Sequence, residues 1–124
     1  MKPRRRIRSL KLIVVVSFFL LGCGGRFAEV EMDVVPLVEY DGWVEKGYCM
    51  GMDGSVSNVL VGGVMSSPVP LCKRGDIVMH THPVWGERTA NFVDFGVWEE
   101  YWKRYGNRMY GVSGNGWVKV YEVK

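Results

Sequence analysis

Residues 76–83 read DIVMHTHP and contain both histidines of the 124-residue chain. The apolar first half predicts a short strand over residues 76–80, and Pro83 predicts that the chain turns away directly afterwards. Residues two apart on an extended strand point to the same face. The imidazoles of His80 and His82 are therefore expected to converge, which favours a metal site over two incidental surface histidines.

A helix is expected to follow this strand after a loop over residues 83–90. Asn91 is a suitable N-cap, and Asp94, three residues later, stands where a capping box has its acidic partner. Gly106 is a fitting residue just past the helix end. Aromatic side chains recur along this stretch at spacings of three and four, and the stripe is predicted to pack in the core. The predicted core stripe consists of Phe92, Phe95, Trp98 and Trp102, and Tyr101 also falls at this spacing.

Strands are predicted on both sides of this helix. Asp53-Gly54 is a typical two-residue hairpin turn, and Gly114-Asn115-Gly116 is a second strong hairpin signal. The alternation in residues 30–35 indicates a short strand or a tether. We therefore expect an α/β (α+β) fold with a small mixed β-sheet packed on one main helix. The strands flanking the two turns are predicted over residues 46–52, 55–64, 108–113 and 117–123.

Asp94 is the candidate for a third metal ligand. A catalytic zinc site takes three protein ligands and leaves one position open. Asp94 follows His82 by 12 residues and falls in the first helical turn. A carboxylate there can also act simply as a favourable charge at the helix N-terminus. Glu87 is a weaker candidate in the loop, and Glu99 and Glu100 are expected on a solvated face.

The run HTHP at residues 80–83, followed by a loop and NFVD at residues 91–94, resembles a known signature. It is similar to the JAMM motif of the JAB/MPN metalloproteins, His-x-His-Pro followed by Ser-x-x-Asp. That family also has a glutamate upstream, at the start of an apolar strand that contains glycine. Residues 45–51 (EKGYCMG) resemble this segment. The resemblance implies a JAB/MPN (cytidine-deaminase-like) architecture.

The same resemblance implies an enzyme that hydrolyses a peptide or isopeptide bond, with a peptide or protein as substrate. Zn2+ would be held by His80, His82 and Asp94, and would lower the pKa of a bound water. Glu45 would accept the proton of that water and deliver it to the leaving amine. The alternative for Glu45 is an exposed charge without a catalytic role. If the strand aligns with the family segment in a different register, Glu39 is the candidate for the proton acceptor.

Two departures from the family motif keep a second function open. Asn91 stands where the motif has the serine that helps to hold the oxyanion, and the interval from His82 to Asp94 is one residue longer than usual. The Asn91 carboxamide, or the hydroxyl of Thr89, is the candidate replacement for the serine. The alternative function is a catalytically inactive MPN-like scaffold that binds a partner protein at the cell envelope.

The first 22 residues form a targeting segment. They hold six basic residues and no acidic one, and residues 12–21 form an apolar run of ten. A membrane-spanning helix needs about 20 such residues, so a signal peptide is favoured. The run ends in Leu20-Leu21-Gly22-Cys23, which looks like a bacterial lipobox. Cys23 is then the lipidation site, with an uncleaved anchor or ordinary signal cleavage as alternatives.

These signals divide the chain into three parts. They are a lipoprotein signal peptide at 1–22, a lipidated N-terminus and tether at 23–38, and a JAB/MPN-like domain at 39–124. We expect an exported protein that is lipid-anchored to the bacterial cell envelope through Cys23. Because Gly24 is not the aspartate that retains lipoproteins at the inner membrane, the outer membrane is expected if the source is Gram-negative.

Outside the targeting segment the chain is slightly acidic and contains two further cysteines. Six of the 16 basic residues lie in the targeting segment, which leaves 10 basic against 13 acidic residues. A mature chain with this balance gives no support for a nucleic-acid partner. Cys49 and Cys72 could form a disulfide in an exported protein or could be two buried thiols.

Overall fold

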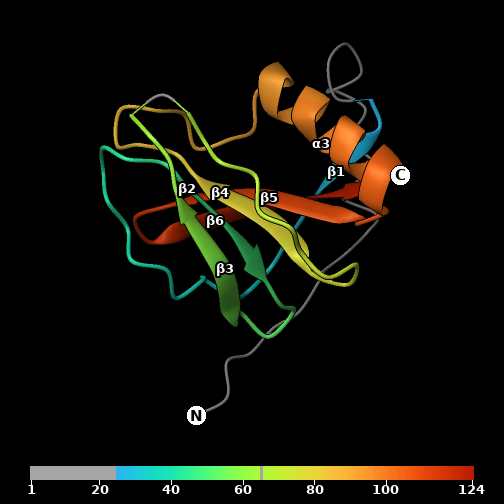
Figure 1. Ribbon diagram of the computed structural model, residues 1–124, viewed down its shortest axis with the longest axis horizontal. Coiled ribbons are helices and arrows are strands. Elements are labelled where there is room, and N and C mark those ends of the chain that lie inside the picture. The colour runs from blue at the N-terminus through green and yellow to red at the C-terminus, as the bar shows by residue number, and fades with distance from the viewer. Residues whose placement is uncertain (1–24, 65) are drawn as a thin grey trace.

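The computed structural model describes residues 25–64 and 66–124. Within them, six strands form one mixed sheet, and the one helix lies against a face of it (Figure 1). This α+β fold confirms the predicted mixed sheet on one main helix. The elements are β1 (Phe27–Val30), β2 (Lys46–Met50), β3 (Val56–Val61), β4 (Ile77–Thr81), α3 (Phe92–Tyr105), β5 (Met109–Gly114) and β6 (Trp117–Val123).

The strand order β1-β6-β5-β4-β2-β3 puts β4 in the middle of the sheet. Strands β4 and β5 are parallel, and every other neighbouring pair is antiparallel. Parallel neighbours need a crossover, and α3 is the element that connects these two strands. The chain therefore passes from the histidine end of β4 through a short loop directly into the start of α3.

Alternation along the central strands divides the core into two layers. Val78 and His80 of β4 face α3, whereas Ile77 and Met79 point to the opposite face. The α3 layer is mostly aromatic and includes Phe27, Phe95, Trp98, Tyr110 and Tyr121. The other layer contains Tyr48, Ile77 and Met79, and Met32 and Val38 from the segment between β1 and β2 pack against this cluster.

The predicted aromatic stripe is confirmed for its central members and wrong at its first. Phe95, Trp98 and Tyr101 are buried, and Trp102 is partly buried, but Phe92 is 71% exposed. An α-helix turns about 100° per residue, so Phe92 points about 120° away from Trp98, the centre of the buried face. The spacing of three and four therefore predicted the helix correctly, but it included Phe92, which lies outside the buried face.

Both helix ends agree with the sequence prediction. Asn91 is the N-cap, and it forms a reciprocal capping box with Asp94. Gly106 follows the last helical residue in the left-handed region, with φ 85°. That conformation costs little for glycine because it lacks a Cβ.

Residues 25–38, which the sequence assigned to the tether, contain the strand β1 and further buried side chains. β1 pairs with β6, Phe27 is buried, and Val34 is only 4% exposed. Residues before 39 therefore take part in the sheet and in the core. The sequence missed this strand because its partner is about 90 residues away, so its pairing leaves no local signal. The hairpin at Asp53-Gly54 also differs, since five residues, 51–55, separate β2 from β3.

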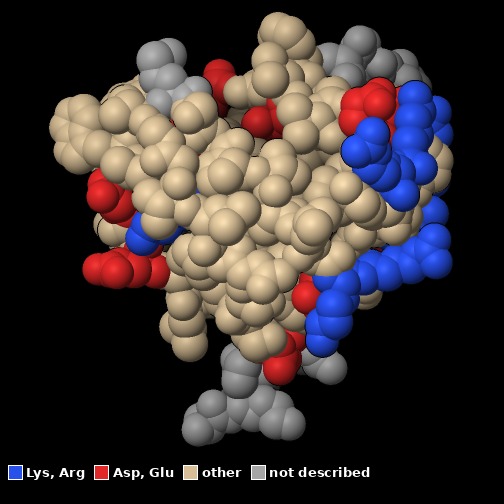
Figure 2. All heavy atoms as spheres, viewed as in Figure 1, with Lys and Arg blue, Asp and Glu red and all other residues tan. Residues whose placement is uncertain are grey.

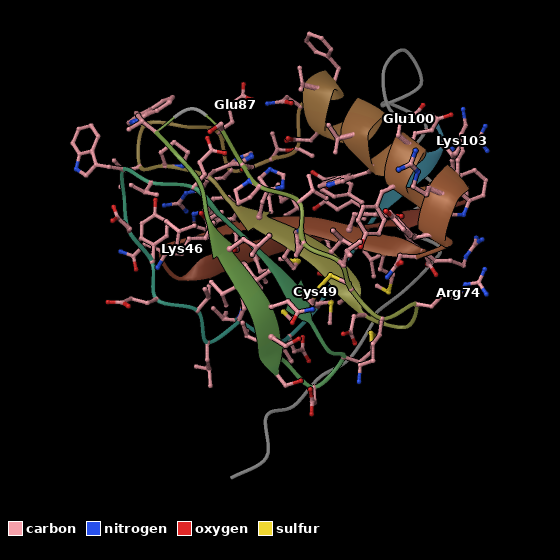
Figure 3. The ribbon with its side chains drawn as sticks, in the orientation of Figure 1. Lys46, Cys49, Arg74, Glu87, Glu100 and Lys103 are labelled. Carbon is pink, nitrogen blue, oxygen red and sulfur yellow. A yellow bond between two sulfur atoms is a disulfide. The ribbon has the colours of Figure 1, made fainter. Side chains whose placement is uncertain are left out.

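A disulfide joins Cys49 in β2 to Cys72, in the loop before β4 (Figure 3). Of the two alternatives left open by the sequence, the structure has the bonded pair. The bond is compatible with an extracytoplasmic domain. Residues 1–24, with the predicted signal peptide and Cys23, lie outside the described residues. In the described part of the chain no helix has the length and apolar character to cross a bilayer.

Candidate metal centre

His80, His82 and Asp94 meet in a buried cluster at the start of α3. His80 Nε2 lies 3.2 Å from His82 Nε2 and 3.2 Å from Asp94 Oδ1. His82 Nε2 lies 3.4 Å from Asp94 Oδ2. The predicted ligand residues are therefore brought together, with the histidines contributed by β4 and its extension and the carboxylate by the helix.

The separations within this cluster are close to those of a tetrahedral metal site, although each imidazole approaches a different oxygen of the Asp94 carboxylate. Nitrogen and oxygen ligands about 2.0–2.1 Å from a zinc ion in tetrahedral geometry lie about 3.3–3.4 Å from one another. The separations of 3.2, 3.2 and 3.4 Å are close to that value. A buried His-His-Asp group of this size could hold a metal ion.

The second nitrogen of His82 is already held by the backbone. His82 Nδ1 lies 2.6 Å from the carbonyl oxygen of Glu87. When Nδ1–H donates to this carbonyl, the lone pair of Nε2 points to the cluster, which is the arrangement typical of a metal-bound histidine. The Tyr40 hydroxyl also donates to the backbone carbonyl of His82 at 2.9 Å. Neither contact was foreseen, because the groups that orient His82 include a backbone oxygen and a distant tyrosine.

Asp94 has a structural role as well as its place in the cluster. Its Oδ2 accepts from the backbone N–H of Asn91 at 3.0 Å, and its own N–H donates to Asn91 Oδ1 at 2.9 Å. This capping box fixes the carboxylate at the helix start. The helix-charge and metal-ligand roles that the sequence left as alternatives are thus geometrically compatible in one side chain.

The cluster also changes the proton affinities of its members. Burial would raise the pKa of Asp94, but hydrogen bonds with His80 and His82 hold that pKa well below its ordinary value. Burial would lower the pKa of His82, but the hydrogen bond with Asp94, the Glu87 carbonyl and the charges of Asp94 and Glu45 raise it. The two shifts favour an ionised Asp94 carboxylate beside the imidazoles, and a carboxylate of this kind is suited to a cation.

Glu45 lies in the wall of the same cavity. It immediately precedes β2, where its backbone pairs with Gly62 and Gly63. The next residue, Lys46, donates its backbone N–H to Thr81 Oγ1 at 2.9 Å, so the start of β2 is fixed beside the two histidines. The Glu45 carboxylate accepts a hydrogen bond from Ser67, a contact that no sequence signal indicated.

The cavity has a volume of about 640 Å³, and the ligand cluster is part of its lining. One wall is the loop containing Ser67 and Pro68, and the other is formed by Val93 and Val97 of α3. Trp85, from the loop after the histidines, lines the mouth and is 53% exposed. A polar, metal-sized cluster inside largely apolar walls is typical of a site that binds a small group or a side chain.

The two candidates for the motif serine differ in their surroundings. Asn91 lines the cavity, and its carboxamide oxygen is engaged in the capping box. Thr89 instead shares a hydrogen bond of 2.8 Å with the Tyr121 hydroxyl, which also accepts from the Ala90 N–H. Tyr121 therefore anchors the loop between the histidines and α3, and Asn91 remains the candidate that faces the cavity.

The other charged candidates stay away from the cluster. The side chain of Glu99 pairs with Arg26 and Lys103, and Glu100 is highly exposed on the outer surface of α3. Glu39 is exposed, and its backbone carbonyl accepts from the Lys46 ammonium. Glu87 contributes its carbonyl oxygen to His82, and Figure 3 shows its side chain in the loop above the sheet.

Comparisons with known proteins add no assignment. No protein-family model matches the chain, and no significant match appears among curated proteins or solved structures. The function proposed for the chain therefore depends on its residues, on their geometry and on the motif that they resemble.

Proposed function

We propose that this chain is a JAB/MPN-type zinc metallopeptidase that hydrolyses a peptide or isopeptide bond. The observation that carries the proposal is the cluster of His80, His82 and Asp94, with nitrogen and oxygen atoms 3.2–3.4 Å apart, in the wall of a cavity shared with Glu45. A purely structural cluster has no need for two convergent imidazoles and a carboxylate beside a cavity. Two histidines and one carboxylate suit zinc, and the resemblance to the JAMM motif favours it further.

When bound, zinc supplies a Lewis acid that makes a water acidic near neutral pH and polarises a carbonyl. The residues of the chain supply the proton transfers. The Glu45 carboxylate is available to accept a proton from the nucleophile and to return it to the leaving amine. Ser67 donates to one oxygen of that carboxylate and restricts its orientation. The Asn91 carboxamide NH2 is the candidate donor to the developing oxyanion.

The walls of the cavity suggest the kind of substrate. Val93, Val97 and Pro68 give the cavity apolar sides next to the polar cluster. A peptide with an apolar side chain near the scissile bond would bury that side chain there while its carbonyl reaches the cluster. Peptides of this kind are therefore the first substrates to test.

We propose that the protein acts at the bacterial cell envelope. The lipobox-like ending of the signal peptide supports lipidation of Cys23, and the Cys49–Cys72 disulfide is compatible with an oxidising compartment. In a Gram-negative source, Gly24 favours the outer membrane.

The decisive experiment combines zinc content with turnover. The purified protein is expected to hold one zinc ion and to cleave members of a peptide library. Glu45→Gln should keep the zinc and lose turnover, whereas Glu39→Gln, a matched change at an exposed carboxylate, should keep both. His82→Ala should lose both. Protein that holds zinc but cleaves no peptide would favour the inactive scaffold, and protein that never holds a metal would reject the proposal.

A further inference from the structure

Basic side chains gather at the end of α3 that is remote from the metal centre. The concentration is visible along one edge of Figure 2, and Figure 3 shows Arg74 and Lys103 at that end. Arg74, Lys103, Arg104 and Arg108 line one shallow hollow there. We call this surface the basic end. Its cationic residues, all exposed, are Arg26, Lys73, Arg74, Lys103, Arg104, Arg108 and Lys124.

The basic end differs in charge from the rest of the processed chain. After residue 22 the sequence has ten basic and thirteen acidic residues. The basic end holds seven of the ten, together with four acidic residues (Asp76, Glu99, Glu100 and Glu122), so its formal charge is +3. The remainder has three basic and nine acidic residues, a formal charge of −6. The domain is therefore strongly polarised, although its net charge is only −3.

Part of this positive charge is not neutralised within the domain. In residues 25–64 and 66–124, neither Arg74 nor Arg104 forms an ion pair, and both side chains are exposed. Lys103 shares its charge with Glu99 and Glu100, and Arg26 pairs with Glu99 at 3.5 Å. The free guanidinium groups are suited to bind phosphate oxygens.

The start of the ordered chain lies within the same surface. Arg26 is held over the Trp102 ring at 4.9 Å, and its carbonyl accepts from the Lys124 N–H at 2.8 Å. Cys23 precedes Arg26 by three residues, which span at most about 11 Å even when fully extended. A lipid on Cys23 would therefore hold the basic end close to a bilayer surface.

We propose that the basic end is a docking surface for an anionic phospholipid bilayer and that it orients the domain on the membrane. The inference uses the proposed lipidation of Cys23 only for the anchor. Each basic side chain close to an anionic surface strengthens binding about fivefold, and the acidic remainder is repelled by the same surface. One orientation is therefore strongly preferred.

This orientation decides where the metal cavity faces. α3 has 14 residues, a length of about 21 Å, and the cavity lies at its other end. With the basic end on the headgroups, the cavity opens toward the aqueous compartment, roughly 20 Å from the bilayer. The substrates it meets are then dissolved or extended peptides rather than membrane-embedded segments.

The test uses the processed chain from residue 23 with Cys23→Ser, which contains the whole described fold and no lipid. We expect it to co-sediment with vesicles of phosphatidylcholine containing one third phosphatidylglycerol, to bind pure phosphatidylcholine vesicles much less, and to dissociate in high salt. The double variant Arg74→Glu/Arg104→Glu should bind the anionic vesicles at least tenfold more weakly. The double variant Lys46→Glu/Lys119→Glu changes the net charge equally elsewhere and should bind like the parent.

Equal binding to both vesicle types, or an equal loss in the two double variants, would overturn the docking surface. Circular dichroism and thermal unfolding of each variant separate a loss of binding from a loss of fold. Zinc content and peptide turnover, measured on the same preparations, report on the proposed enzyme separately. Mass spectrometry of the full chain recovered from bacterial membranes tests the acylation of Cys23 independently of vesicle binding and of enzyme activity.

Discussion

The two ends of α3 use polar residues in opposite ways. At the N-terminal end, two imidazoles and a carboxylate are buried and lie within 3.4 Å of one another. At the C-terminal end, charges are more numerous, but they are exposed and spread over the surface. Burial of polar groups is costly unless they are paired, and the three groups at this end are paired with one another. Their convergence suits a ligand of fixed geometry. Exposed, dispersed charge suits a partner whose own charge is spread over a surface, such as an anionic bilayer.

The largest effect that distinguishes the two ends is expected on metal affinity. His82→Ala removes one of three protein ligands, and we expect zinc to bind at least 100-fold more weakly, or about 3 kcal/mol less favourably. Arg104→Ala, at the other end of the same helix, should leave the affinity unchanged. Competition with a chromophoric chelator measures both. An unchanged affinity in His82→Ala would remove the basis for separating the two ends.

Loss of the disulfide is expected to reduce the free energy of unfolding by about as much as loss of His82 reduces the free energy of zinc binding. Cys49 and Cys72 are 23 residues apart, and their bond restricts the unfolded chain. We expect Cys49→Ala/Cys72→Ala to reduce the free energy of unfolding by about 3 kcal/mol, which lowers the Tm by more than about 10 °C. Zinc affinity should fall much less, since none of the three ligands lies in the closed loop. A Tm unchanged in thermal unfolding would contradict this expectation.

The helix caps give the most direct comparison of the two ends. Asn91→Ala removes a capping side chain, which costs about 1 kcal/mol, and Gly106→Ala forces alanine into φ 85° at a cost of about 1–2 kcal/mol. Only Asn91 also holds a metal ligand, so only Asn91→Ala should weaken zinc binding, by about tenfold. Denaturant unfolding and zinc competition measure the two effects. Equal zinc affinities in the two variants would mean that the cap does not position Asp94.

The smallest expected effect is the dependence of the unfolding free energy on pH, which arises from His82 and Asp94. His82 has a raised pKa, so in metal-free protein its pairing with Asp94 stabilises the fold fully below the ordinary histidine value of 6.5 and is lost as pH rises through the raised value. Asp94 has a lowered pKa, and its contribution is present above 3.8 and lost as pH falls through the lowered value.

Metal binding should reverse this trend near neutrality, because zinc needs deprotonated histidines. From about pH 6 to 8, denaturant unfolding is expected to show decreasing stability with a chelator present and increasing stability with zinc. Variants at the basic end should keep both slopes. Parallel slopes with and without zinc would show that the two histidines do not bind the metal.

Much of the candidate site could be predicted because its signals are local. The same-face arrangement of His80 and His82 follows from strand geometry, and the position of Asp94 follows from a capping pattern. The parts that were missed depend on contacts between distant segments. Tyr40 reaches the backbone of His82 across 42 residues, and Ser67 reaches Glu45 across 22.

In the fold, too, features with local sequence signals were predictable and features that depend on distant contacts were not. The hairpin at residues 114–116 and both helix caps were predictable from a few residues. Strand β1 was not, because it is stabilised by pairing with β6 at the other end of the chain. The sequence also did not decide between a disulfide and two free thiols, because spacing alone does not show whether two cysteines approach each other.

The double use of Asp94 has a consequence for how an ion is captured. The carboxylate is immobilised by the helix before any cation arrives, and His82 is held by the Glu87 carbonyl. A cation would therefore meet a rigid receptor, because the ordering of these side chains is achieved when the chain folds. Histidine, although a good zinc ligand, could not replace Asp94 without giving up the acidic half of the helix cap, so the choice of an oxygen donor is dictated by the backbone.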